Sequence, residues 1–263
     1  MIVIVELPMK TEKEYSIFID DIMANNTDSE ILEKYQQPFP VSFKVIGTGT
    51  GTADIIEKVK LFGYDCVGCI LAKTPSDCIP MDDDKMVIIV AQDNEEVANA
   101  IAKTYHDAGI LTIGLVYNPN IDCFDSVMVD SRHEDFPEII KTLLQPIITQ
   151  GYICFDFNDL CTILHDSGFF TTLTDEGKNV EEAVNNMKKK LENVPTQHIE
   201  SLSAHLYFNR ERQPNITMTD MKHLSEMISS LPESINVIWS VNFDDTLPYD
   251  SIRFSIIMSG NEL

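Results

Sequence analysis

Short apolar runs that alternate with amphipathic helices are the feature that most limits how this chain can fold. Such runs lie at Phe43–Gly47, Cys66–Ala72, Met86–Ala91 and Leu111–Tyr117, and Glu95–Ala108 carries apolar residues at helical spacing. Strands that lack polar alternation are buried on both faces, and helices between successive strands make those strands parallel. The pattern therefore predicts an α/β fold with a mainly parallel sheet covered by helices on both sides.

The C-terminal half has a different pattern. Strands are expected at Ala204–Phe208, Ile235–Val241 and Ile252–Met258, and the last two alternate apolar with polar residues. Helices are expected over Val180–Leu191 and after Thr217, where Thr217 and Asp220 resemble a capping box. These elements predict a smaller mixed sheet, separate from the first and with one solvated face.

The two patterns divide the chain into four parts. Residues 1–42 form an N-terminal extension, expected to contain a short strand at Ile2–Leu7 and two short acidic helices. Residues 43–135 form the parallel-sheet domain, residues 136–150 a connecting helix, and residues 151–263 the mixed-sheet domain.

Charge excludes several classes of partner. The chain has 42 acidic and 19 basic residues, a net charge of -23, so its surface repels nucleic acid and anionic lipid. No apolar run is long enough to span a bilayer, and the N-terminus lacks the features of a signal peptide. Six cysteines in apolar surroundings fit a reducing compartment. We expect a cytoplasmic protein without nucleic-acid or direct membrane contact.

A glycine- and threonine-rich loop is the first candidate binding site. The sequence GTGTGT, Gly47–Thr52, lies between an expected strand and an expected helix. Backbone N–H groups can approach a phosphate closely there, and the helix N-terminus favours an anion. The candidate nucleotide-binding residues are Gly47, Gly49, Thr50, Gly51 and Thr52. The alternative is a tight turn that binds nothing.

Four stretches, in order, resemble the FtsZ/tubulin family. They are FKVIGTGTGTADIIEKV (Phe43–Val59), IAKTYHDAGILTIGLVYNP (Ile101–Pro119), GYICFDFNDLCTIL (Gly151–Leu164) and the C-terminal part that ends with IRFSIIMSG at Gly260. The resemblance implies an FtsZ/tubulin-like fold, in which residues 43–135 are the nucleotide-binding, GTPase-like domain. It also implies GTP or GDP as ligand, a role in the cytoskeleton and cell division, and oligomers with itself or another FtsZ-like subunit.

The third stretch carries the acids that the resemblance implies are catalytic. The family pattern N-x-D-F-x-D matches here at Asp156 and Asp159, with Cys154 in place of the Asn. In the family these acids position a water molecule against the γ-phosphate held by the next subunit, work that suits a carboxylate. A structural alternative exists for Asp159, as the N-cap of a helix that begins at Leu160.

Other expected parts of the nucleotide site are altered. In place of the family's signature phosphate loop stand Gln92, Asp93 and Asn94, with Glu95 and Glu96 at the start of the next helix. Asp93 or Asn94 can cap that helix, and a triphosphate there would meet carboxylates. At the positions that read the guanine base the chain has about His133 and Pro137, and Pro has no side-chain donor or acceptor.

Two functions therefore stay open. The first is an FtsZ-like cytoskeletal or filament-interacting protein with a degenerate GTP site, which modulates cell-division filaments. The second is an active FtsZ homologue that binds and hydrolyses GTP and polymerises. No metal site is predicted: Cys66 and Cys69 would lie on opposite faces of a strand, and the six histidines show no metal spacing.

Overall fold

The computed structural model describes residues 42–117, 121–128 and 132–261. The strand and helices expected within residues 1–41 lie outside the described residues. None of the described helices is long and apolar enough to cross a membrane.

The N-terminal half contains a parallel sheet, as the apolar pattern predicts. Its five strands run in the order β2-β1-β3-β4-β5, and each neighbouring pair is parallel. The elements are β1 (Ser42–Thr48), α3 (Thr52–Lys60), β2 (Val67–Ala72), η1 (Pro75–Asp77), β3 (Asp84–Ala91), α4 (Glu95–Asp107), β4 (Leu111–Val116), η2 (Ile121–Cys123) and β5 (Ser126–Met128). The strand expected at Cys66–Ala72 is less buried than predicted, because β2 lies at the sheet edge.

The C-terminal half contains a mixed sheet, which confirms the predicted fold class. Strand β10 is antiparallel to β7 and β8, whereas β8 and β9 are parallel. After η3 (His133–Asp135) the elements are α5 (Phe136–Ile148), β6 (Gly151–Ile153), α6 (Phe157–Leu164), β7 (Gly168–Gly177), α7 (Val180–Leu191), η4 (Thr196–His198), β8 (Ser201–Phe208), α8 (Met218–Ser229), β9 (Asn236–Phe243) and β10 (Ile252–Gly260). Strands β6 and β7 were not predicted from the sequence.

The expected separation into two sheets is wrong. Strand β5 pairs in parallel with the start of β7, which joins all strands into one ten-stranded sheet. The junction is reinforced because Gly168 N–H donates to Asp125 O at 3.0 Å and the Ser167 hydroxyl donates to Ser126 Oγ at 2.8 Å. Pairing with β7 satisfies backbone groups that β5 would otherwise leave at an open edge.

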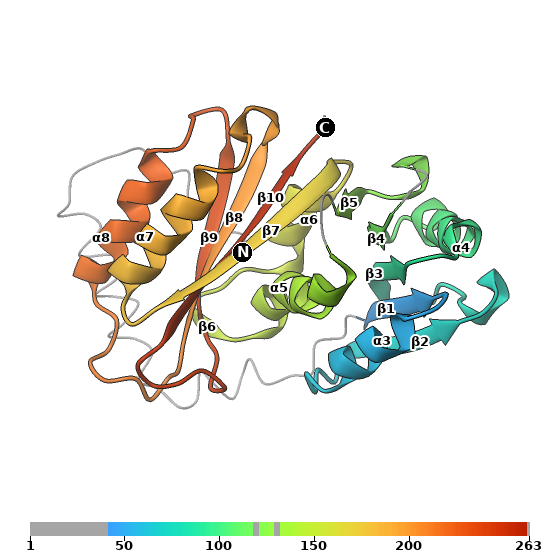
Figure 1. Cartoon of the computed structure of the whole chain (residues 1–263), viewed down its shortest axis with the longest axis horizontal. Helices are drawn as coiled ribbons and strands as arrows, with labels where there is room; N and C mark the ends of the chain where they lie inside the picture. The colour runs from blue at the N-terminus through green and yellow to red at the C-terminus, as the bar shows by residue number, and fades with distance from the viewer. Residues whose placement is uncertain (1–41, 118–120, 129–131, 262–263) are drawn as a thin grey trace.

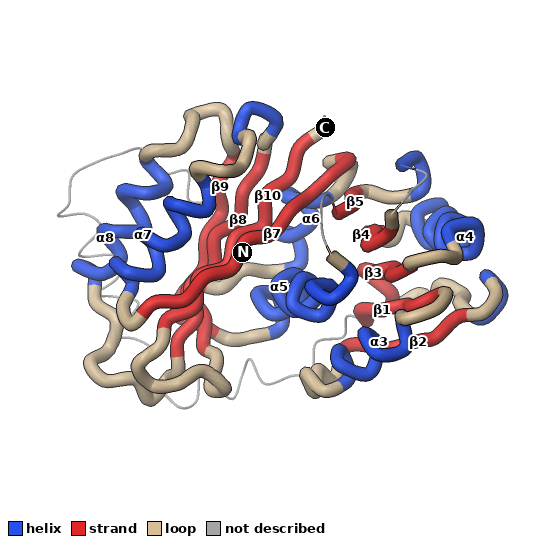
Figure 2. The backbone as a smooth tube through the Cα atoms, viewed as in Figure 1, coloured by secondary structure: helices blue, strands red, loops and turns tan. Residues whose placement is uncertain are grey.

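Helices α5 and α6 lie between the two halves of the sheet (Figures 1 and 2). Their apolar residues form one core with those of α3 and the central parallel strands, while α4 packs on the opposite face. Helices α7 and α8 cover the outer face of the C-terminal strands. Both faces of this part of the sheet are therefore covered.

Because helices cover both faces, the expectation that the C-terminal sheet has one face in water is wrong. Every residue of β10 is buried. Polar residues on β8 and β9 alternate with apolar ones, but they lie buried and bond to one another: His205 contacts the hydroxyls of Ser203 and Ser240 at 2.9 and 2.7 Å. Alternation here marks a buried polar layer.

Candidate functional site

The glycine loop lies at the carboxyl end of β1 and leads directly into α3, as the sequence predicts. Gly49 and Gly51 have φ angles of 87° and 77°, in the left-handed region that favours glycine. The Thr52 hydroxyl donates to Gly49 O at 3.0 Å and closes the turn. Gly51 is the N-cap residue of α3, and no side chain caps the helix.

A carboxylate of the same chain occupies this loop. Thr50 N–H donates to Asp93 Oδ1 at 2.9 Å, and the Thr50 hydroxyl donates to Asp93 Oδ2. A Cβ atom on Gly49 would lie 2.1 Å from Asp93 Oδ1. The hydrogen bonds from the Thr50 hydroxyl and backbone lower the pKa of Asp93. An ionised acid thus takes donors of the kind that a bound phosphate would need.

The neighbours of Asp93 also face the glycine loop. The Asn94 amide donates to Thr48 Oγ1 at 3.0 Å. A Cβ atom on Gly51 would lie 2.7 Å from Gln92 Oε1 and 3.3 Å from the His133 ring. Burial lowers the pKa of His133. The chain from Gln92 to Asn94 and the His133 ring therefore pack against the loop.

This packing corrects the expectation that Asp93 or Asn94 caps α4. Asn94 is the N-cap residue, but its side chain makes no capping hydrogen bond. The side chains of Asp93 and Asn94 instead reach residues at the end of β1 and in the loop after it. Glu95 and Glu96 lie in the first turn of α4, as the sequence indicates.

The two candidate catalytic acids form a reciprocal cap at the start of α6. Asp156 Oδ1 accepts from Asp159 N–H at 3.0 Å, and Asp159 Oδ2 accepts from Asp156 N–H at 2.9 Å. The helix begins at Phe157, so Asp156 is the N-cap, and the expectation that Asp159 has this position is wrong. Burial raises the pKa of Asp159. Cys154, expected in apolar surroundings, is exposed.

These acids and the glycine loop lie toward opposite ends of strand β1. The Phe157 ring at the start of α6 lies 5.8 Å from the ring of Phe43, near the amino end of β1. The glycine loop follows Thr48 at the carboxyl end of the same strand. One chain therefore does not bring Asp156 and Asp159 to its own loop.

Comparison with solved structures identifies the fold. No family model matches the sequence. A mutant of FtsZ from M. jannaschii superposes with a TM-score of 0.67 at 16% identity, covering 88% of this chain and 94% of that chain. An empty FtsZ dimer from M. jannaschii gives 0.63 at 16% identity, over 88% and 91% of the two chains. TubZ of Bacillus thuringiensis serovar israelensis, in GDP-form protofilaments, gives 0.55 at 10% identity, over 84% and 85%.

The chain has the FtsZ/tubulin fold. The resemblance seen in the sequence is thereby confirmed for the architecture, which spans the parallel half, the helix layer and the mixed half. At such low identity the roles of individual residues in this FtsZ/tubulin fold have to be argued from their own geometry.

A buried polar network links α5 to the C-terminal strands of this fold, and the sequence analysis missed it. Asp244 Oδ2 accepts from Gln145 Nε2 and Arg253 Nη2, both at 2.8 Å, and the Arg253 guanidinium lies 4.6 Å from the centre of the Tyr207 ring. Burial alone would raise the pKa of Asp244. Hydrogen bonds from Thr246 and Gln145, together with the Arg253 charge, outweigh burial and hold that pKa at about 2. The network borders a cavity of about 570 Å³.

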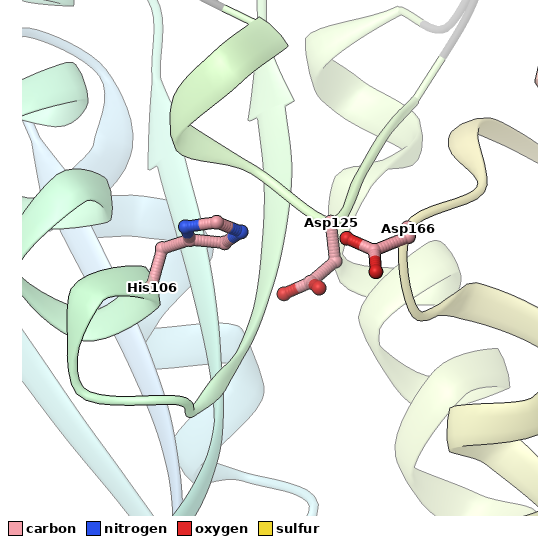
Figure 3. Close-up of side chains that lie close together, drawn as sticks. All are labelled: His106, Asp125 and Asp166. Carbon is pink, nitrogen blue, oxygen red and sulfur yellow. The ribbon is translucent and has the colours of Figure 1, made fainter.

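Among the residues that the structure describes, a group that could hold a metal ion lies elsewhere, at the amino end of β5. Figure 3 shows the side chains of His106, Asp125 and Asp166, whose ligand atoms all lie within 4.8 Å of one another. Their positions in the sequence are far apart, so no spacing rule indicates the cluster.

Proposed function

We propose that this chain is an FtsZ-like, filament-interacting protein that does not use its glycine loop as a GTP cradle. In this proposal it modulates filaments built by an FtsZ-like GTPase in the cytoplasm during cell division. The observation that carries the proposal is the pair of hydrogen bonds from Thr50 to Asp93.

Electrostatic repulsion supports the proposal that Asp93 keeps phosphate out of the glycine loop. A phosphate entering the loop would have to displace Asp93 from the Thr50 N–H and hydroxyl, and the displaced carboxylate would remain beside it. Like charges at such short range repel strongly. Glu95 and Glu96 add negative charge at the adjacent helix N-terminus, where a bound phosphate would otherwise gain from the helix dipole. The net charge of -23 acts in the same direction.

The position of the two acids at the start of α6 supports a docking role. Asp156 and Asp159 are held in place by their mutual cap, near the amino end of β1 and away from the glycine loop. Structures with this fold include an FtsZ dimer and TubZ protofilaments, so copies of such chains assemble in those proteins. Head-to-tail assembly needs two complementary faces. In this proposal Asp93 closes the face that carries the glycine loop. The chain can then join a filament by the face that carries Asp156 and Asp159, and it cannot receive a normal subunit in return.

Sedimentation tests this proposal. The pure chain is centrifuged with and without GTP, and then with FtsZ from the same organism. We expect no GTP-dependent pelleting of the chain alone and a change in the amount of pelleted FtsZ. GTP-dependent pelleting of the chain alone would instead support the active, polymerising homologue.

The role of Asp156 and Asp159 is tested by substitutions that keep the cap of α6. Asn is as good an N-cap as Asp, so Asp156→Asn together with Asp159→Asn removes charge with little loss of capping. We expect this double variant to lose the effect on FtsZ. Asp220→Asn in the equivalent cap of α8, with Thr217, is the matched control and should keep the effect. If the double variant changes the amount of pelleted FtsZ as the parent does, docking through these two acids is contradicted.

A further inference from the structure

Four polar side chains from three separate segments meet at the amino end of β5. His106 lies in the last turn of α4, Asp125 directly precedes β5, and His165 and Asp166 follow α6. Figure 3 shows that the side chains of His106, Asp125 and Asp166 converge from different parts of the fold. His165 lies beside both acids, with Nδ1 3.0 Å from Asp166 Oδ2 and Nε2 3.6 Å from Asp125 Oδ1.

Asp125 is the buried member of this group. Its side chain is 3% exposed. One oxygen, Oδ2, accepts from Thr112 N–H at 2.7 Å. The other oxygen faces His165 at 3.6 Å, beyond ordinary hydrogen-bond distance. A buried carboxylate is costly unless a cation or several donors compensate its charge. The side of Asp125 that carries Oδ1 is therefore suited to a cation.

The ends of two helices add to this preference. Helix α4 ends at Asp107, one residue beyond His106, and α6 ends at Leu164, with His165 as its C-cap residue. The carboxyl end of a helix carries a partial negative charge, which favours a cation. The negative electrostatic potential at the cluster thus comes from two helix ends as well as from two carboxylates.

We propose that this cluster binds one divalent transition-metal ion of the Zn²⁺ class. The ligands are a ring nitrogen of His106, Asp125 Oδ1 and a carboxylate oxygen of Asp166, and His165 orients Asp166 through their contact. A mixed nitrogen and oxygen set favours Zn²⁺ and similar ions over Mg²⁺ and Ca²⁺, which take oxygen ligands.

The ligand atoms have to move closer together to hold one ion. In a tetrahedral site with zinc–ligand distances of about 2.0–2.2 Å, two ligand atoms lie roughly 3.3–3.6 Å apart. The three ligand atoms now lie within 4.8 Å of one another. Asp166 is exposed and His106 is half-buried, so rotation of these two side chains can bring the atoms together around buried Asp125.

Such an ion would clamp the two halves of the fold. His106 and Asp125 belong to the parallel half, whereas Asp166 belongs to the turn that leads into β7. The ion would lie beside the β5–β7 pairing that joins the halves. A ligand that binds the folded chain and not the unfolded chain raises stability, so Zn²⁺ should raise the melting temperature.

Calorimetric titration of Zn²⁺ into the metal-stripped, reduced chain tests the site. We expect one ion per chain. His106→Ala and Asp166→Asn should each weaken binding by roughly tenfold or more, as loss of a ligand or its support does in metal sites. His223→Ala, which removes a histidine that lies near Glu181 on another surface, is the control and should bind as the parent does. Asp125 is left unchanged because its loss would disturb the core.

The absorption spectrum of the Co²⁺-loaded chain distinguishes the proposed site from a site made of cysteines. The chain has six free cysteines, and one of them, Cys154, is exposed. Co²⁺ bound by nitrogen and oxygen shows no thiolate charge-transfer band, and that is the expected spectrum. A thiolate band, equal Zn²⁺ affinity in His106→Ala and Asp166→Asn, or no saturable binding by the parent chain would each overturn the proposal.

Discussion

The contact between Asp93 and Thr50 joins residues that are 43 positions apart. The sequence is sufficient to predict the strand, the glycine loop and the helix after it, and it also indicates that Gln92–Asn94 replace a phosphate loop. It does not predict that Asp93 reaches Thr50, because that contact depends on how β1 and β3 align side by side. The same limit hides the metal-site candidates His106, Asp125 and Asp166, which meet only in the folded chain.

Protonation of Asp244 at low pH should lower the free energy of unfolding. Its pKa in the folded chain is about 2, below its ordinary value of 3.8. The stabilising contribution is therefore complete above about pH 4 and is lost as the pH falls toward 2. Asp244→Asn should lower the free energy of unfolding by about 3 kcal/mol at neutral pH, because Arg253 stays buried without its partner.

Urea unfolding at several pH values checks this expectation. The stability difference between the parent and Asp244→Asn should shrink as the pH falls below about 4. Asp245→Asn is the control, because that neighbouring acid pairs with Arg210 at 2.9 Å while both side chains are 52% exposed. A pH-independent difference for Asp244→Asn would contradict the account.

At the scale of single elements, α6 illustrates how a cap decides a helix boundary. The sequence allows Asp159 to be the N-cap, but Asp156 has this position, and its reciprocal bonds with Asp159 start the helix at Phe157. Each acid therefore has a structural role. Asp156→Ala should lower the free energy of unfolding by about 0.5–2 kcal/mol, and Asp156→Ser should restore most of this loss. Equal stability of Asp156→Ala and the parent in urea would show that the cap is not stabilising.

Strands β8 and β9 show why periodicity alone describes the C-terminal sheet incompletely. Polar alternation in this half suggested a face in water, but the polar side chains bond to one another beneath α5 and α6. Burial of such a layer is possible because hydroxyl, imidazole and amide groups satisfy one another. Periodicity reports which residues share a face, and it does not report what covers that face.

At the scale of the whole molecule, the joined sheet predicts cooperative unfolding. The core that contains α3, α5 and α6 also includes Phe170 of β7 and Ile257 of β10, so it extends into both halves. The division into residues 43–135, 136–150 and 151–263 stays a prediction of the sequence analysis. We expect the two halves to unfold together because they share this core and the β5–β7 pairing.

The single tryptophan makes this testable, because Trp239 lies on β9 in the C-terminal half. Its fluorescence and the far-ultraviolet circular dichroism of the whole chain should give the same urea midpoint. Gly114→Ala, a substitution that would crowd Phe124 in the parallel half, should lower both midpoints together. A fluorescence midpoint that stays unchanged in Gly114→Ala would show that the halves unfold independently.

Equilibrium binding of Mg²⁺-GTP to the purified chain tests the central claim most directly, together with the nucleotide content of the chain as isolated. Because Asp93 holds the Thr50 donors, we predict no bound nucleotide after purification and no saturable binding at micromolar GTP. Asp93→Ala should bind GTP better than the parent, whereas Asp107→Ala at the other end of α4 should not. One equivalent of GTP or GDP in the purified parent, or micromolar affinity that Asp93→Ala leaves unchanged, would contradict the account.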